Sequence, residues 1–250
     1  MTPPPLLTLV ALHVAIAVLC GIALTMDLPT IAGVHPALKP FKFAVSIALL
    51  LGSLAYVVSL LAHHRTAAVL LTWIVTVALL AEMVVIVVQA LRGEASHYNL
   101  RTPFDAAMWR VMGSMILVAL VGLLGLALVT TLEPLRVSPI MAFALRAGLW
   151  LVLLAAVSGA AMGGRSQHTV GAPDGGPGMR VTTWSTTHGD LRIPHFVALH
   201  GLQVLPVVAL VLLALPLGMR ARWVAMIAVT TAWTALGIVT LVRATAGRAW

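Results

Sequence analysis

Seven long apolar runs, separated by polar stretches, dominate the pattern of this chain. The runs cover residues 6–26, 43–62, 67–91, 106–132, 140–162, 195–217 and 223–242. A helix needs about 20 apolar residues to cross the hydrocarbon core of a bilayer. Backbone groups in lipid must be hydrogen-bonded within the protein, so unbroken runs of this length predict helices. The sequence therefore predicts an all-α polytopic membrane protein, with a seven-transmembrane-helix bundle in a single transmembrane domain, residues 1–250.

Composition excludes an ordinary soluble domain. Hydrophobic residues make up 61% of the chain and charged residues 9%, whereas soluble domains are about 25% charged. The net charge of +8 comes from basic residues placed singly at the ends of apolar runs, with no basic stripe. We therefore expect membrane lipid, and no nucleic acid, as a partner. The bias toward Ala, Val, Leu and Arg favours a bacterial plasma (inner) membrane as the location.

The loops differ strongly in length. Those after the first, third and fifth runs are long and cover residues 27–42, 92–105 and 163–194. Crossing the membrane seven times places all three on the same side as the C-terminus. We call this side the long-loop face. Long loops usually carry function, so the working site is expected there.

Basic residues are divided unequally between the two faces. Five lie on the short-loop side: Arg65, Arg136, Arg146, Arg220 and Arg222. The remaining ten of the 15 belong to the long-loop face. Positively charged loops tend to stay in the cytoplasm, so this distribution favours an N-terminus outside the cell.

Two pairs of polar residues lie inside predicted helices at similar depth. At about 1.5 Å per residue, Glu82 lies about 14 Å and Gln89 about 3 Å from the long-loop face. By the same rise, His200 lies about 8 Å and Gln203 about 12 Å from that face. Each pair shares one side of its helix. The two stripes are therefore predicted to line a common pocket that opens to the long-loop face.

Two other polar residues have structural explanations. His13 lies near the opposite side of the membrane, and an interhelical hydrogen bond explains it. A haem held by His13 and His200 would need ligands offset by about 12 Å, so haem is a poorer prediction than a metal ion. Asp105 is expected to be the N-cap of the fourth helix.

Histidines and one carboxylate make a divalent metal ion the leading cofactor prediction. His, Glu and Asp are common ligands of zinc, copper and iron. We assign His97, His195 and His200 as metal ligands and Glu82 as a catalytic general base or a further ligand. Five residues separate His195 from His200, which turns about 140° around a regular helix. They can share one ion only if His195 lies at a frayed helix end.

Glutamine and lysine residues complete the predicted site. Gln89 and Gln203 would orient the metal ligands. The segment H-P-A-L-K-P-F-K-F, residues 35–43, contains both lysines of the chain and is expected to be extended or kinked at its prolines. Lys39 and Lys42 either anchor the chain among lipid headgroups or bind an anionic headgroup or carboxylate at the pocket mouth.

Three functions remain open from the sequence. The leading one is a membrane-embedded metal-dependent enzyme, or a metal-binding redox protein, that acts on a lipid or another lipophilic or anionic small molecule. The alternatives are a non-catalytic accessory membrane subunit and a small permease or channel-like protein that uses Glu82 as a proton or cation site.

Overall fold

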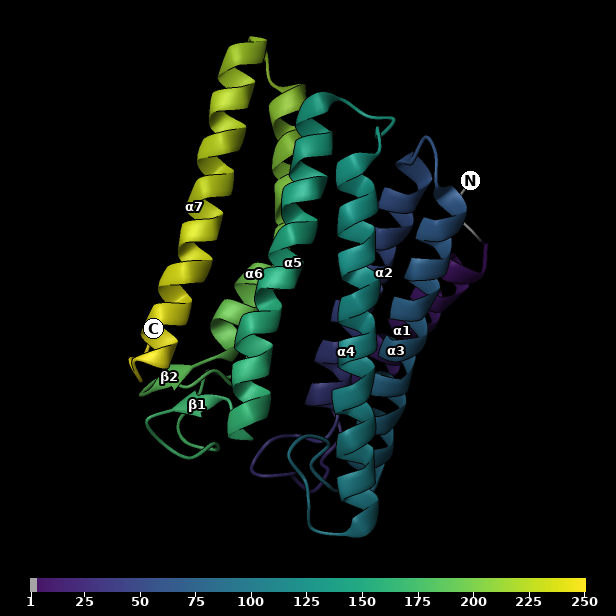
Figure 1. Cartoon of the computed structure of the whole chain (residues 1–250). Coiled ribbons are helices and arrows are strands. Elements are labelled where there is room, and N and C mark those ends of the chain that lie inside the picture. Colours follow the sequence, from purple (N-terminus) through teal and green to yellow (C-terminus); the bar gives the residue numbers. More distant parts are fainter. Residues whose placement is uncertain (1–3) are drawn as a thin grey trace. The chain divides into compact units, whose positions relative to one another are not determined.

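The computed structural model describes residues 4–250, and its regular structure is almost entirely helical (Figure 1). The helices are α1 (Pro4–Ala23), α2 (Leu38–Leu60), α3 (Arg65–Leu91), α4 (Pro103–Leu132), α5 (Pro139–Arg165), α6 (Arg192–Ala214) and α7 (Met219–Thr245). All seven helices in this part of the chain are long and apolar enough to cross a membrane. The predicted seven-helix, all-α membrane architecture is confirmed. The bacterial location and the orientation stay predictions.

The chain divides into two compact units, and each is described by itself. Unit 1 extends to Pro134 and contains α1–α4, whereas unit 2 starts at Leu135 and contains α5–α7. In unit 1, α2 packs against α1 and α3, and α3 packs against α4. In unit 2, α6 packs against both α5 and α7. Each unit is thus a small bundle of helices that are neighbours in sequence.

Prolines move several helix ends away from the predicted positions. The prediction that residues 35–43 are extended or kinked is wrong from Leu38 onward, because α2 begins there and includes Pro40 in its first turn. Similarly, α6 begins at Arg192 and includes Pro194. The first N–H groups of a helix have no intrahelical acceptor, so proline costs little there. At the other end, α6 stops at Ala214 because the residue before Pro216 is extended.

An apolar core joins the first three helices of unit 1. Its buried members are Leu6 and Ala17 from α1, Ala44, Ile47, Leu51 and Ala55 from α2, and Met83 from α3. Leu6 and Ala17 are three helical turns apart, so α1 applies one side of its whole length to this core. The other side of α1 is exposed, as expected for a helix that faces lipid.

Glycines let helices approach closely where α5 crosses α6. A Cβ added at Gly148 would lie 2.6 Å from the Cα of Leu202, and one at Gly201 would lie 2.7 Å from a methyl of Leu151. In unit 1, Gly122 and Gly125 of α4 lie just as close to α3. Small residues at such crossings are typical of membrane helices, whose association depends on close packing.

The third long loop forms a cap on unit 2. Its two short strands, β1 (Thr169–Val170) and β2 (Gly189–Asp190), pair antiparallel beside the C-terminal end of α7 (Figure 1). A Cβ at Gly189 would lie only 2.1 Å from the carbonyl oxygen of Ala244, so glycine is required at this contact. The loop is therefore built against the last turn of α7.

Replacing Gly148 by alanine should destabilise unit 2. The added methyl group meets backbone atoms of α6, which must shift, and overpacking of this kind costs about 1–3 kcal/mol. Thermal unfolding of the purified protein in detergent measures the loss. Gly163→Ala, on the same helix with open space at its Cβ, is the matched control. Equal melting temperatures for both variants would contradict the close crossing.

Candidate functional site

The predicted site residues lie on two different units. Lys39, Lys42, Glu82, Gln89 and His97 belong to unit 1, and His195, His200 and Gln203 belong to unit 2. A pocket shared by both sets stays a prediction. The geometry of each set can be described separately, and unit 1 is the more informative.

Lys39 connects two titratable groups of unit 1, the buried Glu82 and the half-buried His97. Its Nζ lies 3.0 Å from Nδ1 of His97, although 58 residues separate them. The charge of Lys39 also acts on Glu82, which is only 6% exposed on α3. We call Lys39, Glu82 and His97 the Lys39 cluster. It joins the first turn of α2, the second half of α3 and the loop before α4.

Three aromatic rings enclose the imidazole of His97. The ring centroids of Phe43, Tyr98 and Trp109 lie 5.9, 5.9 and 5.5 Å from that of His97. Tyr98 has φ 58°, a left-handed conformation that is uncommon for a residue with a side chain. Its ring packs edge-on against Trp109 at 4.9 Å. The loop therefore adopts a strained backbone where the aromatic enclosure closes over His97.

Protonation of His97 is strongly disfavoured. Burial, followed by the positive charge of Lys39, holds the pKa of His97 well below its ordinary range. His97 is accordingly neutral near pH 7. Because the ammonium of Lys39 donates to Nδ1, the proton of the imidazole resides on Nε2. A cation beside Nδ1 also works against a divalent metal ion at this ring.

Gln89 belongs to a separate network that fixes the start of α4. Its Nε2 donates to Oδ1 of Asp105 at 2.8 Å, and its Oε1 accepts from Arg92. Arg92 also binds Asp105 at 2.7 Å. The prediction that Asp105 is the N-cap of α4 is wrong. Thr102 is the N-cap and its hydroxyl accepts from the Asp105 N–H, while Asp105 accepts from that hydroxyl in return.

His13 lies buried in unit 1 with half of its ring unpartnered. It is 0% exposed, and its Nδ1 lies 2.8 Å from the carbonyl oxygen of Leu9 in the same helix. The predicted interhelical hydrogen bond is therefore wrong, since Nδ1 bonds within α1. Nε2 is buried and has no hydrogen-bond partner. A buried polar atom without a partner is destabilising, so His13 needs another explanation.

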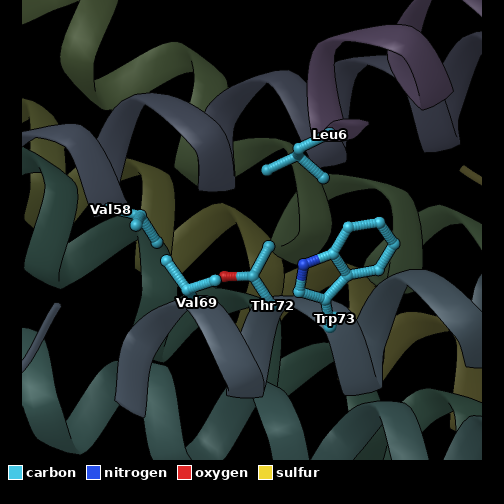
Figure 2. Close-up of a pocket in the computed structure, with 5 residues that line it drawn as sticks. All are labelled: Leu6, Val58, Val69, Thr72 and Trp73. Atoms are coloured by element: carbon cyan, nitrogen blue, oxygen red, sulfur yellow. The ribbon is translucent and has the colours of Figure 1, made fainter. Parts of the chain in front are cut away.

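A narrow gap opens in unit 1 away from the Lys39 cluster. It is lined by Leu6, Val58, Val69, Thr72 and Trp73 (Figure 2). These residues come from the beginnings of α1 and α3 and the end of α2. The gap is too narrow for a water molecule. It marks where the three helices separate at their short-loop ends.

In unit 2, His195 and His200 each bond to a backbone carbonyl. Nδ1 of His195 lies 2.9 Å from the carbonyl oxygen of Ala155, and Nδ1 of His200 lies 2.8 Å from that of Phe196. The ring of His200 also stacks on Phe196 at 3.8 Å. His195 is the fourth residue of α6 and its N–H bonds to the carbonyl oxygen of Leu191, so the helix is not frayed there, as sharing one ion with His200 would require. Gln203 is half-buried one turn beyond His200.

No metal site is evident within either unit. Among residues 4–250, no three His, Cys, Asp or Glu side chains come together where they could hold a metal ion. Metal ligation by His97, His195 and His200 stays a prediction, as do the cofactor-binding roles of Lys39, Lys42, Gln89 and Gln203.

Asp190 is an anchor that the sequence did not single out. It is 1% exposed and accepts hydrogen bonds from the Ser185 N–H at 2.8 Å and from Arg192, whose two guanidinium contacts to it are 2.9 and 2.6 Å. Arg192 also donates to Thr183 Oγ1 at 3.0 Å. The only signal in the sequence is the spacing Asp-x-Arg at the start of a helix.

Comparisons with protein-family models, with curated proteins and with solved structures find no match for this chain. The residues of unit 1 and unit 2 described above are therefore the basis for a functional proposal.

Asp190→Asn should lower stability in a pH-dependent way. Burial raises the pKa of Asp190, but the hydrogen bonds and charge of Arg192 outweigh burial and leave this pKa below its ordinary value. The carboxylate then stabilises the fold above the unfolded pKa of about 4, and this contribution is lost as pH falls below it. The melting-temperature difference between wild type and Asp190→Asn should be large at pH 7 and shrink toward pH 3. A constant difference would contradict this.

Proposed function

We propose that the protein is a small permease- or channel-like membrane protein that uses Glu82 as a proton-binding site. The contact between Lys39 Nζ and His97 Nδ1, beside the buried Glu82, carries the proposal. Ionisable groups inside a membrane are costly and usually belong to ion sites or proton relays.

The charges of the Lys39 cluster allow two states that differ by one proton. A carboxyl group buried in a membrane is favoured in its neutral form, whereas a cation nearby favours the carboxylate. These opposed effects let the carboxyl group gain or lose a proton without leaving an uncompensated anion in the bundle. A carboxyl group with no cation nearby would simply stay neutral.

His97 can pass a proton onward from this cluster. For transfer toward the long-loop face, Glu82 gives its proton to Lys39 while Lys39 gives one of its own protons to Nδ1 of His97. His97 then releases the proton from Nε2 to water at the long-loop face, so that the ring is neutral before and after the step and its remaining proton lies on Nδ1. Glu82 is left as a carboxylate paired with the ammonium of Lys39. Each transfer moves one proton.

Infrared titration tests Glu82 directly. A protonated carboxyl group absorbs at a higher wavenumber than a carboxylate, so the wild type should show a pH-dependent carboxyl band that Glu82→Gln lacks. Lys39→Met should change the pH dependence of this band, because it removes the cation of the cluster.

Glu94→Gln is the matched control, since Glu94 lies outside the helices in an ion pair with the exposed Arg101. This variant should retain the band. A wild-type spectrum that does not differ from that of Glu82→Gln at any pH would contradict the proposed proton site.

A metal-dependent function is the second candidate, supported by the hydrogen bonds of His195 and His200, although a regular α6 keeps these two side chains from sharing one ion. A histidine that donates its Nδ1–H to a carbonyl oxygen has a free lone pair on Nε2. Metal-binding histidines usually have this arrangement. His195 and His200 both face a carbonyl oxygen in this way. Such a site would serve an enzyme or redox protein that acts on a lipophilic substrate.

Metal analysis separates the two candidates. If unit 2 binds zinc, copper or iron, purified wild type should contain metal that a His195→Ala/His200→Ala double variant lacks. His63→Ala/His64→Ala, which removes two exposed loop histidines, is the control. Equal metal content in wild type and the His195/His200 variant would exclude these ligands.

A further inference from the structure

Residues 178–185 of the third long loop form a hairpin with an exposed tip. The N–H of Met179 donates to the carbonyl oxygen of Trp184 at 2.9 Å, so these two residues are neighbours across the hairpin. At the tip, Val181 is 65% exposed and Met179 is 40% exposed, and the exposed Arg180 lies between them in the chain. We call residues 178–185 the loop hairpin. Its tip combines a cation with two exposed apolar side chains.

A buried ion pair fixes the loop hairpin to the start of α6. The buried carboxylate of Asp190 accepts a hydrogen bond from the Ser185 N–H at 2.8 Å. Arg192, which pairs with Asp190, donates to Oγ1 of Thr183 at 3.0 Å and also to the carbonyl oxygen of that residue. Thr183 has φ 60°, a left-handed conformation that is uncommon for a residue with a side chain. The direction of the hairpin relative to α6 is therefore set by specific contacts.

An aromatic contact joins the loop hairpin to the exposed side of α6. Trp184 packs edge-on against Phe196, with ring centroids 5.3 Å apart. Phe196 is 43% exposed, and Val207 and Val211 are 58% and 54% exposed farther along the same side of the helix. The exposed apolar side of a helix that crosses the membrane thus continues through Phe196 to the hairpin.

The length of α6 places this contact at the edge of the bilayer. At about 1.5 Å per residue, its 23 residues extend about 34 Å, and the hydrocarbon core is about 30 Å thick. Phe196 lies about 6 Å along the helix from its first residue. Tryptophan is enriched at this level of membrane proteins, where one side of its ring meets lipid and the other meets water. The loop hairpin therefore lies at the level of the lipid headgroups.

We propose that the loop hairpin binds the bilayer surface, with Met179 and Val181 among the ends of the acyl chains and Arg180 at a lipid phosphate. Burial of the two apolar side chains in lipid is favourable because it removes them from water. A guanidinium binds phosphate through two parallel N–H donors. The fixed base of the hairpin then holds the cap of unit 2 against the membrane at the long-loop face. This binding does not depend on the proton site at Glu82.

Spin-label accessibility in liposomes tests the proposal on the full-length protein. Cys20→Ser removes the single native cysteine, and Val181→Cys or Met179→Cys then provides one position for a nitroxide label. The liposomes contain phosphatidylcholine and phosphatidylglycerol. Power saturation measures collisions of the label with oxygen, which concentrates in the membrane, and with a nickel chelate, which stays in water. The oxygen-to-nickel ratio at both tip positions should be several-fold higher than at Gly176→Cys, an exposed position of the same loop with open space at its Cβ.

The two collision rates distinguish the environments of the tip. A label at Val207→Cys on the exposed side of α6 calibrates the lipid environment. Nickel collisions at the tip as frequent as at Gly176→Cys would place it in water and overturn the proposal. Rare collisions with both reagents would indicate a protein neighbour, such as a second copy of this chain, and would overturn it as well. Melting curves check each variant, and Met179→Cys decides the question if Val181→Cys does not fold.

Charge reversal tests the contact between Arg180 and lipid. In the labelled Val181→Cys protein, Arg180→Glu should lower the oxygen-to-nickel ratio toward that of Gly176→Cys, because anionic lipid repels the new carboxylate. An unchanged ratio would overturn the phosphate contact of Arg180.

Discussion

The positive charge of Lys39 is the constraint on which the polar interior of unit 1 depends. Without it, the carboxyl group of Glu82 would lose the cation that acts on it, and Nδ1 of His97 would lose its nearer partner. The charge reaches both groups because α2 begins at Leu38 and places Lys39 in its first turn. Proline at position 40 is compatible with that turn. A backbone property at one helix end thereby sets the electrostatics of two residues on other elements.

Two different kinds of polar burial occur in this protein. The Gln89–Asp105–Arg92 network and the Asp190–Arg192 pair have matched donors and acceptors, and each fixes a loop to a helix start. Such networks stabilise one conformation. His13 differs, because its buried Nε2 has no hydrogen-bond partner among the described residues. Incomplete matching is a cost to folding.

Much of the fold could be predicted from the sequence because the membrane demands long apolar helices. All seven spans were found, and the errors lie at helix ends, including those where proline is compatible with the first turn. Glu82 was singled out because a carboxylate in an apolar run is visible by itself. The contact between Lys39 and His97 was not predicted, because it depends on a loop conformation with Tyr98 in the left-handed region. Gln89 was identified as a polar residue of α3, but its partners across 16 residues of chain could not be read from spacing.

The contact between Gly189 and the carbonyl of Ala244 has a consequence for biosynthesis. The cap formed by residues 166–191 is made well before α7, yet its second strand rests on the last turn of that helix. During synthesis the cap therefore lacks this support until the C-terminal helix has been made. Unit 2 reaches its final form only after translation is almost complete, whereas unit 1 can assemble while unit 2 is still being synthesised.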